Sequence, residues 1–121
     1  LSKKIGDMDF DGLVTDLTPP VQVHGGTITK VAAAVTYKRG TVLGKNEAGA
    51  LSLYDGTTTP DCILCDEVAV GTEADVNAAV YTAGCFDPGK VTVADGYTLT
   101  VADIDKLRTR GIVFKAATPA G

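Results

Sequence analysis

Glycine and proline divide this chain into short apolar runs, and this division limits the fold to short strands joined by turns. Two clear runs are Thr41-Val42-Leu43, which Gly44 follows, and Leu51-Ser52-Leu53, which ends in a turn at Gly56. Neither a histidine, an acidic pair nor a phosphate-binding loop lies between them. The apolar content is largely Val and Ala with many Thr, and β-branched residues suit a pleated, half-buried surface. We therefore expect a protein built to pack and bind rather than to turn over a substrate.

Length and composition set the size and class of the fold. A chain of 121 residues predicts one domain with a modest core. Aromatic residues make up only 6% of it, and the 14 glycines and 5 prolines supply frequent turns. We predict a mainly β, β-rich α+β fold: a small mixed or antiparallel β domain with one short C-terminal helix and an extended N-terminal arm.

The charge distribution argues against nucleic acid as a partner. The formal net charge is −4 and the basic residues are scattered, whereas nucleic-acid binders carry a basic stripe that contacts phosphates. No apolar run approaches the roughly 20 residues that a membrane helix requires. We expect a soluble protein, made in the cytoplasm, that binds neither nucleic acid nor membrane directly.

One helix is predicted over residues 101–110. Thr100 is a suitable N-cap, and Asp103 three residues later matches a capping pattern at the positive end of the helix. Apolar residues at positions 101, 104 and 107 fall on one face. Gly111 suits the position after the last helical residue, and residues 112–114 are expected to return as a strand.

Strands are expected where apolar residues lie between turn signals. His24-Gly25-Gly26 indicates a hairpin turn that joins strands at residues 21–23 and 27–29. Asp87-Pro88-Gly89 predicts a second turn. The remaining strands are expected at residues 31–37, 41–43, 51–53, 62–70 and 77–86.

The first 20 residues have no sustained periodicity and end in Pro19-Pro20, which resist helix formation. Their apolar residues would be wasted on a frayed terminus, so we expect an extended arm that becomes ordered against a partner. The chain is accordingly divided into an N-terminal arm and hairpin (residues 1–36), a β domain (residues 37–115) and a loose C-terminal tail (residues 116–121).

The three cysteines are predicted to be reduced and buried, because an odd number is a poor basis for a disulfide framework. Cys62 and Cys65 have the spacing of redox and zinc sites, but they open an apolar run typical of a buried strand. On a strand, residues three apart point to opposite faces with Cα atoms about 10 Å apart, too far for a disulfide. His24 with Cys62, Cys65 and Cys85 could form a Cys₃His zinc site, but the second half lacks paired spacing. We predict no metal, no cofactor and no catalytic residue.

The order of these elements carries a resemblance to a known family. From Tyr37 to Phe114 the chain presents Gly40-Thr41-Val42-Leu43, then Tyr54-Asp55-Gly56-Thr57, two apolar runs, and the short helix that ends in Gly111-Ile112-Val113-Phe114. This succession resembles the head decoration proteins of tailed bacteriophages, the group typified by the phage lambda decoration protein. The specificity lies in the order of the elements, since each motif alone is weak.

The resemblance implies a structural protein rather than an enzyme. Such a protein binds the outer surface of the expanded phage head as a homotrimer and stabilises it, with the major capsid protein of the same virus as its partner. Residues 1–36 would be the capsid-contacting part and residues 37–115 the decoration-protein-like domain. The apolar residues of the arm are the expected capsid-binding residues: Ile5, Met8, Phe10, Leu13, Val14 and Leu17.

Two alternatives remain at the level of the sequence. The chain could be the capsid-anchoring module of a head fibre or receptor-binding fibre, although only a short tail follows Phe114. It could also be a small thiol redox or zinc-binding protein that uses Cys62 and Cys65.

Overall fold

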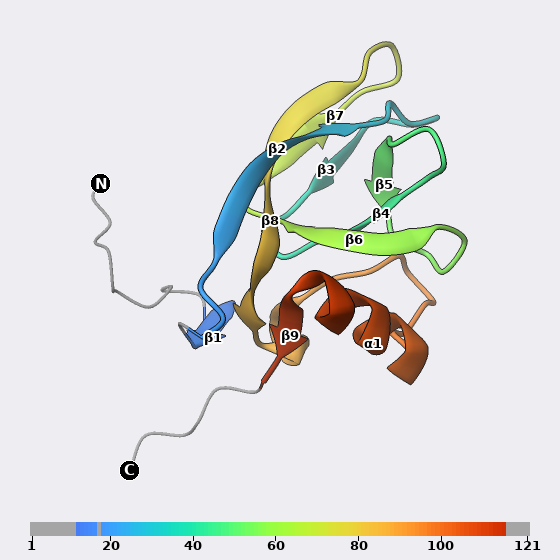
Figure 1. Ribbon diagram of the computed structural model, residues 1–121. Coiled ribbons are helices and arrows are strands. Elements are labelled where there is room, and N and C mark those ends of the chain that lie inside the picture. Colours follow the sequence, from blue (N-terminus) through green and yellow to red (C-terminus); the bar gives the residue numbers. More distant parts are fainter. Residues whose placement is uncertain (1–11, 17, 116–121) are drawn as a thin grey trace, which may run out of the picture.

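The structure is a computed structural model that describes residues 12–16 and 18–115. It is rich in strands, with one α-helix near the C-terminal end of the described chain (Figure 1). This confirms the predicted fold class. The elements in chain order are β1 (Val14–Asp16), β2 (Gln22–Ile28), β3 (Val35–Tyr37), β4 (Val42–Lys45), β5 (Leu51–Leu53), β6 (Thr59–Leu64), β7 (Val68–Val70), β8 (Val76–Phe86), the 3-10 helix η1 (Pro88–Lys90), α1 (Val101–Arg110) and β9 (Ile112–Phe114).

The long strand β8 organises the sheet. It pairs antiparallel with β2, β6 and β1 and parallel with β9. The path from β8 through β2, β5, β4 and β6 returns to β8, so these strands form a closed sheet. The strands β3 and β7 form a separate two-stranded ribbon, which lies behind β2 in the view of Figure 1.

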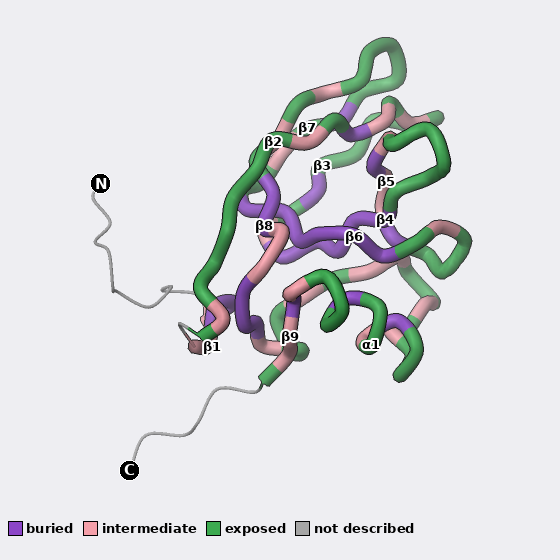
Figure 2. Tube along the Cα trace, viewed as in Figure 1, coloured by how far each residue is buried: buried purple, intermediate pink, exposed green. Residues whose placement is uncertain are grey.

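Two apolar clusters lie on opposite faces of the central strands. On β4 the neighbours Val42 and Leu43 belong to different clusters, and on β6 Ile63 and Leu64 do the same. Side chains alternate between the faces of a strand, so both faces of β4 and β6 are covered. Figure 2 shows this as continuous burial along β6, whereas β2 is exposed along most of its length. Burial on both faces explains why Cys62, Ile63 and Leu64 of β6 are consecutive apolar residues.

The helix α1 has the predicted bounds and caps. The Thr100 side chain accepts a hydrogen bond from the backbone N–H of Asp103, and Gly111 ends the helix in the left-handed conformation at φ 106°. The predicted apolar face is wrong at one position, because Val101 is 76% exposed. Leu107 is buried as predicted, and Asp103 is buried as well, because a polar network beneath the first turn binds its carboxylate.

The prediction of a hairpin turn at Gly25-Gly26 is also wrong. His24, Gly25 and Gly26 lie within β2 and pair with Val80, Ala79 and Ala78 of β8. A Cβ atom at Gly26 would lie 2.6 Å from Cδ1 of Leu51. This glycine therefore allows the close approach of a neighbouring side chain, which is a recognised use of glycine inside a strand.

Two other predicted strands have different bounds. The run over residues 62–70 divides into β6 and β7, because the exposed Asp66 and Glu67 interrupt it where the chain bends. The strand predicted at residues 31–37 is ordered as β3 only from Val35 onward, because its partner β7 spans just three residues. The turn at Asp87 is confirmed, with its side chain accepting from the backbone N–H of Gly89.

Candidate functional site

The beginning of the described chain is built into the body of the domain. In β1, Val14 lies opposite Phe86 and Asp16 lies opposite Cys85 of β8. Leu13 is 1% exposed and Val14 is 7% exposed, and both belong to the apolar cluster that also holds Phe86. β1 is therefore a packed strand of the domain.

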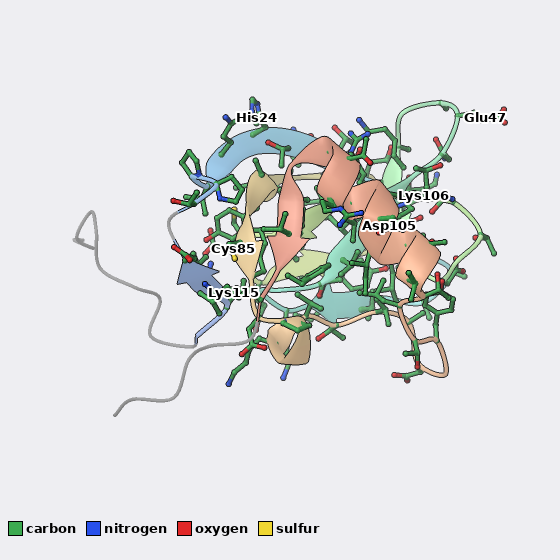
Figure 3. All side chains as sticks on the ribbon, turned by 60° about the horizontal axis from the view of Figure 1, so that its bottom comes forward. His24, Glu47, Cys85, Asp105, Lys106 and Lys115 are labelled. Carbon is green, nitrogen blue, oxygen red and sulfur yellow. The ribbon has the colours of Figure 1, made fainter. Side chains whose placement is uncertain are left out.

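The end of the described chain lies next to β1. Thr15 donates from Oγ1 to the backbone oxygen of Lys115 at 2.8 Å, and Lys115 Nζ forms an ion pair with Asp16 Oδ2 at 3.1 Å. Lys115 also donates its backbone N–H to Phe86 at 2.8 Å. Figure 3 shows Lys115 and Cys85 beside β1 at one end of the molecule. The chain thus enters and leaves the described domain at neighbouring positions.

The six predicted capsid-binding residues fall into two groups. Leu13 and Val14 point into the domain, so in this conformation their side chains are not available to a partner. Both residues were expected on a binding surface, but they contribute to the core at the end of β8. Ile5, Met8, Phe10 and Leu17 lie outside the described residues.

The three cysteines are free and buried. Cys62 and Cys65 belong to different apolar clusters, as expected for residues three apart on an extended segment. Burial raises the pKa of the Cys62 thiol, and the neighbouring Asp61 carboxylate raises it further. A thiol held in its neutral form is a poor nucleophile and a poor metal ligand. The geometry therefore gives no support to a thiol redox or zinc function.

The residues of the hypothetical Cys₃His site are not brought together as ligands. His24 is exposed on β2, whereas Cys85 is buried near β1, where its Sγ lies 3.5 Å from Thr15 Oγ1. Within the described ranges, no group of three or more His, Cys, Asp or Glu residues is arranged to hold a metal ion. The helix of the described chain is neither long nor apolar enough to cross a membrane.

A buried polar network joins the helix to the sheet. The Asp103 carboxylate accepts from the hydroxyl of Tyr54 at 2.5 Å, from the hydroxyl of Tyr97, and from the backbone N–H of Thr100 at 2.9 Å. The rings of Tyr54 and Tyr97 meet edge to face, with centroids 5.5 Å apart. Sequence reasoning identified Asp103 as a capping residue but missed both tyrosines, since Tyr54 is 49 positions away in the chain.

This network makes stability depend on pH. Burial raises the pKa of Asp103, but the hydrogen bonds from Thr100, Tyr54 and Tyr97 outweigh burial and lower it to about 2. A carboxylate with a depressed folded-state pKa stabilises the protein above its unfolded-state pKa, which is about 4, and loses that contribution as the pH falls. We expect the melting temperature to fall between about pH 4 and pH 2.

The measurement is a series of thermal unfolding curves from pH 7 to pH 2 on the wild type and Asp103→Asn. Hydrogen bonds from Thr57 also lower the pKa of Asp55, so the variant should keep part of the acid dependence. The part that it loses belongs to Asp103. Equal slopes in the two proteins between pH 4 and pH 2 would contradict the assignment.

The chain matches a known protein family over most of its length. A family model described as "Bacteriophage lambda head decoration protein D" matches residues 11–112. This range begins just before β1 and ends with the first residue of β9, so it covers nearly all of the described chain. None of the curated proteins matches.

Proposed function

Because the chain belongs to the family of the bacteriophage lambda head decoration protein D, we propose that it binds the outside of the expanded phage head as a homotrimer and stabilises that shell. The family is one of structural phage proteins and not of enzymes. Its members decorate the phage capsid, so the partner that we propose is the major capsid protein of the same virus.

The observation that carries this proposal is the position of β1. Leu13 and Val14 are fixed in the core, and Thr15 and Asp16 contact Lys115. Residues 1–11, which we name the N-terminal peptide, therefore begin at a rigid end of the domain. Its apolar residues Met8 and Phe10 alternate with Asp7, Asp9 and Asp11, as in a strand with two different faces.

We propose that the N-terminal peptide adds as a strand to an exposed sheet edge of the capsid protein. In this mode of recognition the backbone supplies affinity and pockets for alternate side chains supply specificity. Met8 and Phe10, which share one face of such a strand, would fill such pockets, and Ile5 would contact the capsid from the opposite face. Leu13 and Val14 would instead hold the base of the peptide in the domain, which moves the boundary of the capsid-contacting segment from residue 36 to residue 11.

The homotrimer gives this binding its strength. Ordering a free segment costs roughly 1–2 kcal/mol per residue, so a single peptide of this length binds weakly. Three peptides on one trimer raise the effective concentration of each after the first is bound, and avidity can exceed a single affinity by about 10² to 10⁴. Release of one peptide would then leave the trimer on the shell.

Deletion of residues 1–11 tests this proposal. The deletion variant should lose at least about 100-fold in affinity for expanded heads, because the contact and its avidity disappear together. The measurement is co-sedimentation of purified protein with expanded and with immature heads over a range of protein concentrations. The wild type should sediment with the expanded heads only.

The control is the variant's own fold and oligomeric state, measured by circular dichroism and by sedimentation equilibrium. Both should match the wild type, because the deletion ends before the first packed residue. A variant that keeps wild-type affinity for expanded heads would rule out the N-terminal peptide as the capsid contact.

A further inference from the structure

A charged cleft lies beside the exposed strand β2. It has a volume of about 470 Å³, and its walls include the β2 residues 24–27 on one side and Lys45, Asp61 and Arg110 on the other. We name it the β2 cleft. Figure 3 shows His24 on the outer surface of β2, away from the core. None of the residues of the pH-sensitive tyrosine network lines the cleft.

The β2 cleft carries a surplus of positive charge. The Asp61 carboxylate is buried and forms ion pairs with Arg110 and with Lys45 Nζ, the latter at 3.7 Å. Arg110 also donates from Nε to the backbone oxygen of Asp61 at 3.2 Å. The two cationic side chains remain 44% and 43% exposed. Two cations against one carboxylate leave one unit of positive charge that faces solvent in a protein whose net charge is −4.

The strand that forms one wall of the cleft has an open edge. β2 pairs with β8 from Gln22 to Ile28, but its other edge meets β5 only at Ile28, opposite Leu51. Within the described chain, no other strand pairs with residues 22–27 on that side. Val23 is 54% exposed on the same strand. Open edges of this length are templates for pairing with another chain.

The protein has a second open edge with the opposite charge beside it. In the described chain β7 pairs only with β3, through three residues. Asp66 and Glu67 directly precede β7, and both are exposed. Residues 66–70 thus carry two exposed carboxylates at the bend before β7, followed by strand backbone groups that can join another strand.

We propose that the β2 cleft receives residues 66–70 of a second copy of this chain. Pairing of β7 with the open edge of β2 would place Asp66 and Glu67 near Lys45 and Arg110, with His24 above them. The contact joins two different surfaces, and such heterologous contacts form closed rings when the rotation between copies closes. This inference rests on the homotrimer proposed above and assigns the surfaces that hold it together.

Charge reversal on the acidic side tests the assignment without disturbing the core. The variant Asp66→Lys/Glu67→Lys changes two exposed residues, so the subunit should fold normally. We expect the protomer concentration needed for half-assembly to rise at least about tenfold, because like charges would meet in the cleft. Sedimentation equilibrium across protein concentrations gives this value. The matched control Asp95→Lys/Asp105→Lys changes the net charge equally at exposed positions outside the cleft and should assemble like the wild type.

Charge exchange provides the second test. Lys45→Glu alone should also weaken assembly. When it is combined with Asp66→Lys/Glu67→Lys, the protomer concentration needed for half-assembly should fall at least about threefold below that of the Asp66→Lys/Glu67→Lys variant, because opposite charges meet again. Thermal unfolding of each variant checks that the subunit still folds. Recovery in the combined variant requires that the two sites touch, since two separate structural defects would add rather than cancel.

The outcomes separate this inference from the proposed function. A wild type that is monomeric at all concentrations overturns the homotrimer and this contact together. A wild-type trimer that the Asp66→Lys/Glu67→Lys variant also forms equally well overturns this contact alone. If that variant assembles normally but no longer binds expanded heads, residues 66–70 contact the capsid protein instead of a second copy, and the inference is likewise wrong.

Discussion

Replacement of Asp103 by alanine should lower the free energy of unfolding by about 3 kcal/mol. The side chain accepts hydrogen bonds from Tyr54, Tyr97 and the backbone of Thr100, and hydrogen bonds to a charged group contribute about 1.5–3 kcal/mol each. The variant leaves the buried Tyr54 hydroxyl without its acceptor, which costs more than the loss of an exposed bond. It also removes one half of the capping box of α1.

This loss is a large fraction of the whole free energy of unfolding, because that free energy is about 5–15 kcal/mol for natural domains. Urea titration at a fixed protomer concentration measures it, because assembly makes apparent stability depend on concentration. Asp105→Ala is the matched control: it lies on the same helix, and its ion pair with Arg108 at 2.9 Å is exposed, so about 0.5 kcal/mol or less is expected. A change below about 1 kcal/mol for Asp103→Ala would show that the network contributes little.

Extending the N-terminal deletion through β1 should destabilise the domain by at least about 4 kcal/mol. Removal of residues 1–16 takes Leu13 and Val14 out of the core, and large-to-small changes at such positions cost about 1–5 kcal/mol each. It also uncovers Phe86, breaks the pairing of β1 with β8 and removes the Asp16–Lys115 ion pair. Deletion of residues 1–11 should leave stability within about 0.5 kcal/mol of the wild type.

Urea unfolding of the two deletion variants and of Leu13→Ala checks this difference. Leu13→Ala should lower the free energy of unfolding by about 2–4 kcal/mol. Because this variant retains the N-terminal peptide, it should bind heads with wild-type affinity when the assay is run well below its melting temperature. If deletion through residue 16 is as stable as deletion through residue 11, then β1 is not part of the core. The whole N-terminal region would then act as one free arm.

The helix shows where local sequence was sufficient. Thr100, Asp103 and Gly111 act through contacts within a few residues of each other, so their roles at the two ends of α1 could be predicted and are confirmed. The strand after Gly111 and the turn at Asp87 were predicted for the same reason. The exposure of Val101 could not be predicted, because it depends on how the helix is rotated against the sheet.

The glycines of β2 show where local sequence misled. Gly25-Gly26 between alternating residues is a common hairpin signal, yet both glycines pair with β8, which lies more than 50 residues away in the chain. The 11-residue strand β8 favours a continuous strand β2, because so long a strand needs partners along both edges. Nothing in the neighbourhood of His24 specifies that partner.

The candidate sites also include features that the sequence indicates and features that only the tertiary structure shows. The apolar residues of the N-terminal region were recognised from composition, and Ile5, Met8 and Phe10 keep their proposed role. The separation of Leu13 and Val14 from that group required the packing against Phe86. The β2 cleft was also missed, because Lys45, Asp61 and Arg110 meet only after three separate segments have folded.

The sequence by itself determined a β-rich domain, the caps and bounds of α1, the separation of Cys62 from Cys65 and the family resemblance. These features depend on residue spacing, on side-chain alternation and on the order of the elements along the chain. Only the tertiary structure decided that Leu13 and Val14 belong to the core, how Tyr54 and Tyr97 hold Asp103, and where strand edges remain open in the described chain. Each of these depends on contacts between distant segments, whose free energy no short stretch of sequence contains.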